Sequence, residues 1–107
     1  MLEAELQKKI IEYLLPLQPE KVILFGSYVY GKPNKESDID LLVIKDIPKN
    51  KVREYRLQIK KMLWQKFNDE NIYFDVLVDN EQRIYERIKI GDLFYQEIYN
   101  NGQVIYA

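Results

Sequence analysis

Hydrophobic residues recur along the chain with two spacings, one typical of helices and one typical of short buried strands. Four segments have apolar residues three or four positions apart, as in an amphipathic helix: residues 2–14, 50–67, 81–89 and 92–100. Pro16 and Pro19 end the first of them, and Gly91 separates the last two. The pattern therefore predicts four helices.

Four shorter segments are rich in apolar, branched and aromatic residues, which favours strands. They are Lys21–Phe25, 38–44, 72–78 and Gln103–Tyr106. The first is almost entirely apolar and stops abruptly at Gly26, so it is predicted to be buried. A polar loop containing Pro33 precedes the second, and the last comes after Gly102 and is expected at a sheet edge.

The first and second strands are separated by only about a dozen residues. A parallel crossover needs about that many residues for its helix alone, so a mixed or antiparallel pairing is expected. Such a pairing places Gly26 and Ser27, where one strand ends, beside Asp38 and Asp40, where its neighbour begins. We therefore predict a single α+β domain over residues 1–107, with a small mixed sheet, helices packed on one face and the site on the open side.

Composition narrows the chemistry. The chain has 107 residues, 47% of them hydrophobic, which suits one compact domain. It contains neither a bilayer-spanning apolar run nor a secretory signal pattern, and the absence of cysteine fits a cytoplasmic protein. Because histidine is absent as well, carboxylates must carry any acid–base or metal chemistry.

The charge is nearly balanced overall but uneven along the sequence. Sixteen basic residues oppose 17 acidic ones, for a net charge of −1, and this balance disfavours direct binding of nucleic acid. Residues 49–66 nevertheless contain one acid, Glu54, among the following basic residues: Lys49, Lys51, Arg53, Arg56, Lys60, Lys61 and Lys66. A solvated helix face is the favoured interpretation, and a phosphate or partner contact is the alternative.

Three aspartates are candidates for binding a metal ion. Asp38 and Asp40 lie two positions apart in a predicted strand, so their side chains project to the same face. Two close carboxylates repel unless a cation lies between them, and oxygen ligands select Mg²⁺ or Mn²⁺ over zinc. Asp75 lies inside the apolar strand 72–78, where, taken alone, it is explained equally well as a charge facing water at a sheet edge. Beside Asp38 and Asp40, however, it can complete a two-metal site for phosphoryl transfer.

The turn after the first strand is a candidate phosphate site. Gly26 lets a phosphate approach the main chain, and the hydroxyl of Ser27 can donate to a phosphate oxygen. Gly31 is expected to give the next turn the freedom to lead back towards the acidic strand. A Gly-Ser pair alone is usually an ordinary turn, so its value as a signal depends on the order and spacing of Gly31, Asp38 and Asp40 after it.

The combined pattern resembles the nucleotidyltransferase signature of the DNA polymerase β superfamily. The matching parts are an apolar strand, Gly26-Ser27, Gly31, Ser37-Asp38-Ile39-Asp40 and then Asp75. The resemblance covers residues 21–78, and residues 92–106 are similar to the ending of the minimal nucleotidyltransferases of prokaryotes, in which the domain stands alone. It implies the polymerase β-like nucleotidyltransferase fold.

The resemblance also implies a role for each matching residue. Asp38, Asp40 and Asp75 would be catalytic and would hold two Mg²⁺ ions, with Asp75 helping to deprotonate the attacking hydroxyl. Gly26, Ser27 and Ser37 would bind the phosphates of ATP.

The chain departs from the family between Gly26 and Gly31. Many members carry arginines there, where this chain has Tyr28, Val29 and Tyr30. Cations for the triphosphate would then come from Lys32, from Lys35 or from a partner chain.

By this resemblance the chain would transfer a nucleoside monophosphate, AMP from ATP, to a hydroxyl of a partner protein. The implied partner is a helical HEPN-domain protein encoded in the neighbouring frame, with this chain as antitoxin of the pair and with homo- or hetero-oligomers expected. A non-catalytic antitoxin module that acts by contact, with a vestigial site, is the alternative. The nine tyrosines could stack on a base or accept AMP, although core and interface roles are favoured.

Overall fold

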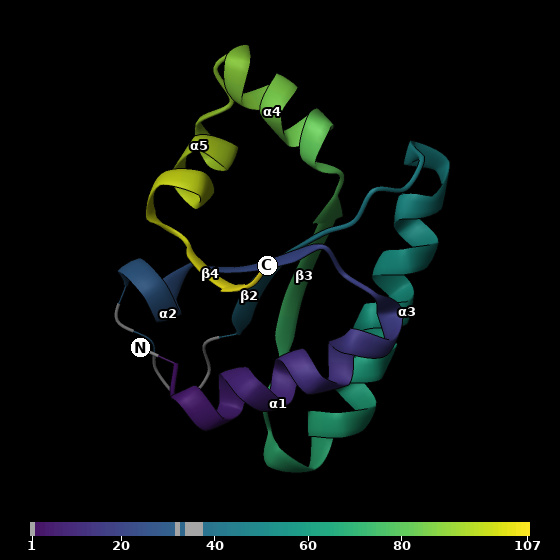
Figure 1. Ribbon diagram of the computed structural model, residues 1–107. Coiled ribbons are helices and arrows are strands. Elements are labelled where there is room, and N and C mark those ends of the chain that lie inside the picture. Colours follow the sequence, from purple (N-terminus) through teal and green to yellow (C-terminus); the bar gives the residue numbers. More distant parts are fainter. Residues whose placement is uncertain (1, 32, 34–37) are drawn as a thin grey trace.

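A four-stranded mixed sheet forms the centre of the molecule (Figure 1). The computed structural model describes residues 2–31, 33 and 38–107. The strands occur in the order β3-β2-β1-β4 across the sheet. Their bounds are Lys21–Phe25 for β1, Ile39–Ile44 for β2, Phe74–Asp79 for β3 and Gln103–Tyr106 for β4.

Two long and three short α-helices surround the sheet in the described part of the chain. The α-helices are α1, Ala4–Leu14; α2, Ser27–Tyr30; α3, Lys49–Phe67; α4, Glu81–Lys89; and α5, Leu93–Asn101. Single 3₁₀ turns, Leu15–Leu17 and Asn68–Glu70, come directly after α1 and α3. None of the helices that the structure describes is long and apolar enough to cross a membrane.

The strand pairing confirms the expected mixed sheet. β1 is antiparallel to both β2 and β4, whereas β2 and β3 are parallel and joined through α3. In its described residues, the connection after β1 contains the single helical turn α2. A short connection is enough because it joins antiparallel neighbours. β4 lies at one edge of the sheet, as predicted, and β3 lies at the other.

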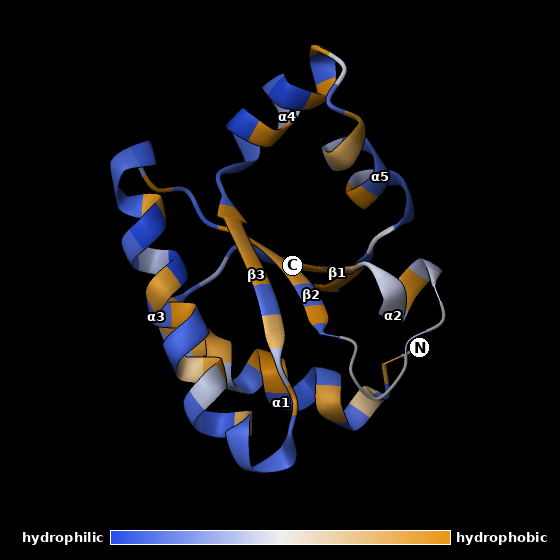
Figure 2. Ribbon diagram, turned by 180° about the vertical axis from the view of Figure 1, so that it is seen from behind, coloured by the Kyte–Doolittle hydropathy of each residue, from blue (hydrophilic) through white to orange (hydrophobic). Residues whose placement is uncertain are grey.

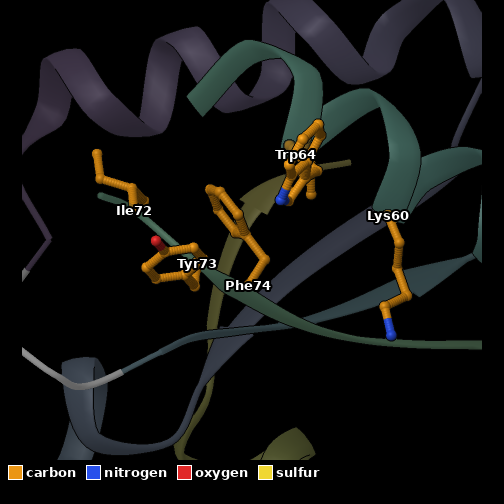
Figure 3. A pocket seen from close by; sticks show the side chains of 6 residues that line it. Lys60, Trp64, Ile72, Tyr73 and Phe74 are labelled. Atoms are coloured by element: carbon orange, nitrogen blue, oxygen red, sulfur yellow. The ribbon is translucent and has the colours of Figure 1, made fainter. Parts of the chain in front are cut away.

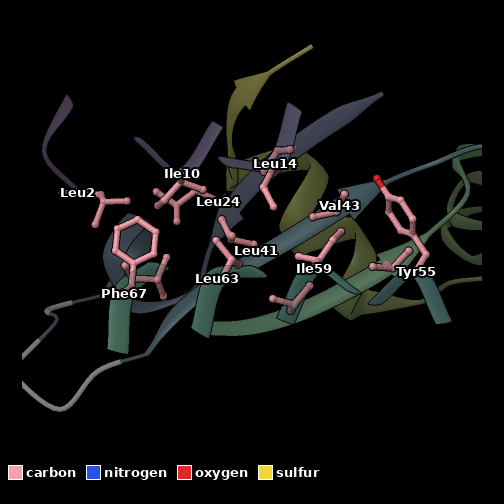
Figure 4. Close-up of a cluster of buried hydrophobic side chains, with 14 residues drawn as sticks. Leu2, Ile10, Leu14, Leu24, Leu41, Val43, Tyr55, Ile59, Leu63 and Phe67 are labelled. Atoms are coloured by element: carbon pink, nitrogen blue, oxygen red, sulfur yellow. The ribbon is translucent and has the colours of Figure 1, made fainter. Parts of the chain in front are cut away.

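The main core lies between the sheet and helices α1 and α3 (Figure 4). Alternate residues of β2, including Ile39, Leu41 and Val43, point into it and meet Ile59 and Phe67 from α3. Hydrophilic and hydrophobic residues alternate along α1 and α3, whereas most strand residues are hydrophobic (Figure 2). The charged residues of both helices are exposed, apart from the half-buried Arg56. This separation explains why the helical patterns of residues 2–14 and 50–67 were readable in the sequence.

The opposite face of the sheet is not open, which corrects the expectation that helices pack on one face only. Ile84 of α4 and Ile98 of α5 are buried against Ile23, Leu42 and Ile44 on that face. Because residues 41–44 form an unbroken apolar run, β2 needs cover on both sides. Helices α4 and α5 supply that cover over part of the face, at the opposite side of the sheet from α1 and α3 (Figure 1).

Candidate active site

The parallel pairing of β2 and β3 brings two of the predicted aspartates side by side. Asp40 is the direct register partner of Asp75, and Asp38 lies one residue before β2. Strand alternation puts Asp40 on the same face as Leu42 and therefore on the side covered by α4 and α5. Asp38 and Asp75 are exposed and Asp40 is half-buried, so the carboxylates lie at an end of that face which the helices leave accessible.

The charges of the neighbouring aspartates act on Asp40. Burial raises the pKa of Asp40 above its ordinary value, and the charges of Asp75 and then Asp38 raise it further. Within the described residues, no group of three acidic side chains already converges as ligands around one point. The arrangement is thus an acidic cluster across two strands.

Gly26 brings the end of β1 against this cluster. Phe25 pairs with Asp40 across the β1–β2 ladder, and Gly26 comes next with φ 78° and ψ −155°, a conformation that is essentially restricted to glycine. A β-carbon at this position would lie 1.9 Å from Oδ2 of Asp40. Glycine is therefore needed both for the turn and for the close approach of the carboxylate to the backbone.

Ser27 begins the single helical turn α2 directly beside the cluster. The amides of Val29 and Tyr30 both donate to the carbonyl of Gly26, at 3.0 and 3.1 Å, which holds this turn closed. Gly31 has an extended backbone, φ −127°, so the expectation that it supplies conformational freedom is wrong. It is small for another reason: a β-carbon there would come within 3.0 Å of the Cα atom of Ser27.

The family assignment rests on a comparison with known protein families. The family described as nucleotidyltransferase domain matches residues 6–105, nearly the whole chain. The chain belongs to this family. Membership in the polymerase β superfamily, and with it the α+β fold class, is thereby confirmed.

Curated relatives of this nucleotidyltransferase domain come from the archaeon Methanocaldococcus jannaschii. MJ0604, a candidate protein adenylyltransferase, is 29% identical over 87 residues, which are 81% of this chain and 78% of MJ0604. MJ0141, also a candidate protein adenylyltransferase, is 31% identical over 96 residues, or 89% of this chain and 87% of its own. Both matches extend well beyond the aspartates and the Gly-Ser turn.

Two solved structures share the fold of the nucleotidyltransferase domain. One is a toxin–antitoxin complex with AMP-PNP, with a TM-score of 0.59, and the other is a mutant of the toxin–antitoxin pair MntA-HpeT, with a TM-score of 0.63. Each is 18% identical to this chain, and each match covers 94% of this chain and 73% of the other. At this identity the likeness concerns the fold.

Some of the remaining residues singled out in the sequence of this nucleotidyltransferase domain lie in the described part of the chain, and others do not. Ser37, Lys32 and Lys35 lie outside the described residues. Tyr28 and Val29 are half-buried and pack against the main core, so they act as structural residues of the Gly-Ser turn.

Sequence reasoning did not single out Phe94 at the start of α5. Its ring packs edge-on against Phe25, the register partner of Asp40, with centroids 5.8 Å apart, and it is nevertheless largely exposed. An apolar residue on an amphipathic helix normally indicates core, so the sequence carried no signal for this position.

Proposed function

We propose that this nucleotidyltransferase domain transfers AMP from ATP to a hydroxyl of a partner protein. The hydroxyl oxygen forms a bond to the α-phosphorus, the bond to the bridging oxygen breaks, and pyrophosphate leaves. The hydroxyl proton passes to Asp75 or to water. The observation that carries the proposal is the register pairing of Asp40 with Asp75 beside Gly26, which puts a carboxylate pair next to the turn proposed to hold the phosphates.

The acidic cluster fits hard divalent cations. Its donors are carboxylates, the chain lacks cysteine and histidine, and burial followed by repulsion from Asp75 and Asp38 raises the pKa of Asp40. We propose that Asp38, Asp40 and Asp75 bind two Mg²⁺ ions, for which Mn²⁺ can substitute. Bound Mg²⁺ supplies positive charge that stabilises the entering and leaving oxygens.

The nucleotide phosphates are proposed to lie against the turn at Gly26 and Ser27, with Ser37 completing the set. The carboxylate of Asp40 lies where a side chain of Gly26 would begin, so this turn is directly beside the proposed metal ligands, and Ser27 offers a hydroxyl. Asp75 lies on the strand farther from this turn and is proposed to accept the proton of the attacking hydroxyl.

The acceptor is proposed to be a helical HEPN-domain protein encoded in the neighbouring frame, with residues 1–107 acting as one antitoxin domain. Two observations support this. The curated relatives are candidate protein adenylyltransferases, and both structures with this fold are of toxin–antitoxin pairs, one of them with an ATP analogue.

Intact-mass measurement of the partner after incubation with ATP and Mg²⁺ tests the proposal. We expect the partner to gain the mass of one or more AMP groups with the wild-type chain and none with Asp75→Asn, which should still associate with the partner. An unchanged partner mass with every nucleotide, together with neutralisation of the partner by Asp75→Asn, would establish the non-catalytic antitoxin module instead. The absence of arginine at positions 28–30 is the observation that favours this second function.

A further inference from the structure

The order of the strands determines from which side an acceptor reaches the acidic cluster. Gly26 and Ser27 lie at the end of β1, Asp40 lies on the neighbouring strand β2, and Asp75 lies on β3 at the edge of the sheet. In phosphoryl transfer the entering and leaving oxygens lie roughly in line on opposite sides of phosphorus. If the leaving pyrophosphate is held beside β1, the entering hydroxyl comes from the side of β3.

An exposed aromatic surface lies on that side. Trp64 of α3 and Tyr73, the residue before β3, have 59% and 52% of their surfaces exposed. With Lys60 and Phe74 they line a shallow cleft of about 110 Å³ between α3 and the start of β3 (Figure 3). Phe74 immediately precedes Asp75, and strand alternation turns its side chain towards α3, on the opposite face from Asp75. The cleft therefore lies around the edge of the sheet from the acidic cluster, at the same end of β3.

The edge of β3 itself is closed to strand addition at its centre. The backbone carbonyls of Tyr73 and Asp79 accept hydrogen bonds from the amides of Ile39 and Lys45. The backbone N–H and C=O groups of odd-numbered residues in β3 therefore point towards β2, and those of the even-numbered residues point away from the sheet. Arg56 of α3 reaches across this outer edge and donates from Nε to the carbonyl of Val76 at 2.7 Å. Arg56 therefore leaves the side chains of the cleft beside Trp64, and not the centre of the β3 backbone, as the accessible part of this edge.

Basic side chains lie in and beside the cleft. Lys60 lies in the cleft wall and Lys61 is the next residue on the helix. Neither lysine forms an ion pair with any acidic residue in the part of the chain that the structure describes. A second groove at the other end of β3 is lined by Lys49, Arg53 and Arg56, together with Arg83 in its ion pair with Asp79. An acceptor with apolar residues flanked by acidic ones would complement both features.

We infer that the cleft formed by Lys60, Trp64, Tyr73 and Phe74 docks the acceptor protein, through an apolar and acidic segment next to the hydroxyl that receives AMP. This inference rests on the proposed function, because the direction of approach depends on the transfer reaction. Exposed aromatic residues in a cleft are typical anchors of such an interface.

The single tryptophan of the chain allows a direct test. Incorporating 5-fluorotryptophan gives one ¹⁹F resonance, from Trp64. We expect the protein encoded in the neighbouring frame to shift or broaden it, and Mg²⁺–ATP alone to leave it nearly unchanged. A resonance that responds to an RNA oligonucleotide or to dilution of the chain alone, and not to the partner, would overturn the inference in favour of RNA binding or self-association.

Substitutions then separate docking from chemistry. Trp64→Ala and Tyr73→Ala should each raise the KM for the partner about tenfold or more, with kcat and ATP affinity kept. Lys60→Glu should weaken binding too, most strongly at low salt. Tyr85→Ala, which removes an aromatic residue of α4 that is 64% exposed, is the matched control and should change nothing.

The two ways of failing are distinguishable. If the wild-type chain adds no AMP to the partner, the proposed function fails. If it adds AMP while Trp64→Ala and Tyr73→Ala keep the wild-type KM, only the docking surface fails.

Discussion

Two residues, Gly26 and Asp40, fix the relation between the Gly-Ser turn and the acidic cluster. The carboxylate of Asp40 occupies the space in which a side chain at position 26 would begin. Anything larger than glycine there must displace Asp40 as well as strain the backbone. The effect of such a change on the fold and its effect on the site are therefore coupled.

Gly26→Ala should destabilise the fold by about 1–3 kcal/mol and abolish Mg²⁺–ATP binding. Gly91→Ala is a control of the same type, because Gly91 also has a positive φ, 97°, but a β-carbon there meets nothing within 4 Å. We expect it to cost about 1 kcal/mol and to leave nucleotide binding intact. Urea unfolding and calorimetry measure both quantities, and equal effects of the two substitutions would contradict the role of the Asp40 contact.

The raised pKa of Asp40 predicts a pH-dependent penalty in metal-free protein. A carboxyl whose pKa is higher in the folded than in the unfolded state lowers stability when it is ionised, and the penalty is relieved as pH falls through the raised pKa. In EDTA at pH 7, Asp40→Asn should therefore melt at a higher temperature than the wild type, and the difference should shrink as the solution is acidified. A difference that stays constant with pH would mean that the charge of Asp40 is not its source.

At the scale of elements, the sequence predicted most of the fold because each element has its own local signal. Three elements have the expected bounds: Lys21–Phe25, Glu81–Lys89 and Gln103–Tyr106. Each of the other predicted elements begins and ends within about two residues of its predicted bounds. The antiparallel start of the sheet was predictable from loop length. The position of α4 and α5 was not, since an amphipathic helix shows that it has an apolar face but not which face of a sheet it covers.

The site was predictable to a similar extent. The grouping of Asp40 with Gly26 could be inferred from strand order, whereas the pairing of Asp40 with Asp75 depended on a long-range contact that a sequence can only suggest. The hydrogen bond from the hydroxyl of Tyr95 to the carboxylate of Asp79, 16 residues earlier, was not predicted. Hydroxyl-to-carboxylate contacts of this kind leave no periodic trace in a sequence.

Asp79 connects the end of β3 to both terminal helices. Its side chain, almost fully buried, accepts a hydrogen bond from the hydroxyl of Tyr95 at 3.0 Å and pairs with Arg83 at 3.3 Å. The same arrangement raises the pKa of Tyr95 to about 12, through burial and then the charge of Asp79. The hydrogen bond therefore fixes α5, which carries Phe94 next to the site.

Tyr95→Phe should cost about 2 kcal/mol of unfolding free energy, because it leaves a buried carboxylate short of a donor. Tyr99→Phe makes the same chemical change one helical turn later, at a buried hydroxyl without a partner in the described structure, and should be neutral or stabilising. Urea denaturation of the two variants provides the comparison. If Tyr99→Phe lowered the free energy of unfolding as much as Tyr95→Phe does, the hydrogen bond to Asp79 would contribute nothing to stability.

At the scale of the whole molecule, β2 and β3 carry the three site aspartates at one end and apolar residues beyond them, up to Asp79 at the last position of β3. Leu41 to Ile44 are fully buried, and Val76 and Val78 are buried beside them, whereas Asp38, Asp40 and Asp75 share the other end. Stability thus resides in the apolar part of the sheet, and the cost of the clustered charges is confined to the end where a cation would relieve it.

This division predicts how a ligand changes the stability of the whole chain. A ligand that binds only the folded state adds about 2.7 kcal/mol when its concentration is 100 times its Kd, which is roughly 10–20 °C in melting temperature for a domain of this size. Mg²⁺–ATP should therefore raise the melting temperature strongly, while ATP with EDTA should raise it little. Asp38→Asn and Asp40→Asn should lose most of the Mg²⁺–ATP shift.

Asp46→Asn is the matched control, because it removes the same charge just beyond the opposite end of β2, and it should keep the full shift. If Asp46→Asn lost as much of the shift as Asp40→Asn, the effect would reflect net charge and not a site. If ATP gave the same shift with and without Mg²⁺ in all variants, the acidic cluster would not be the metal site.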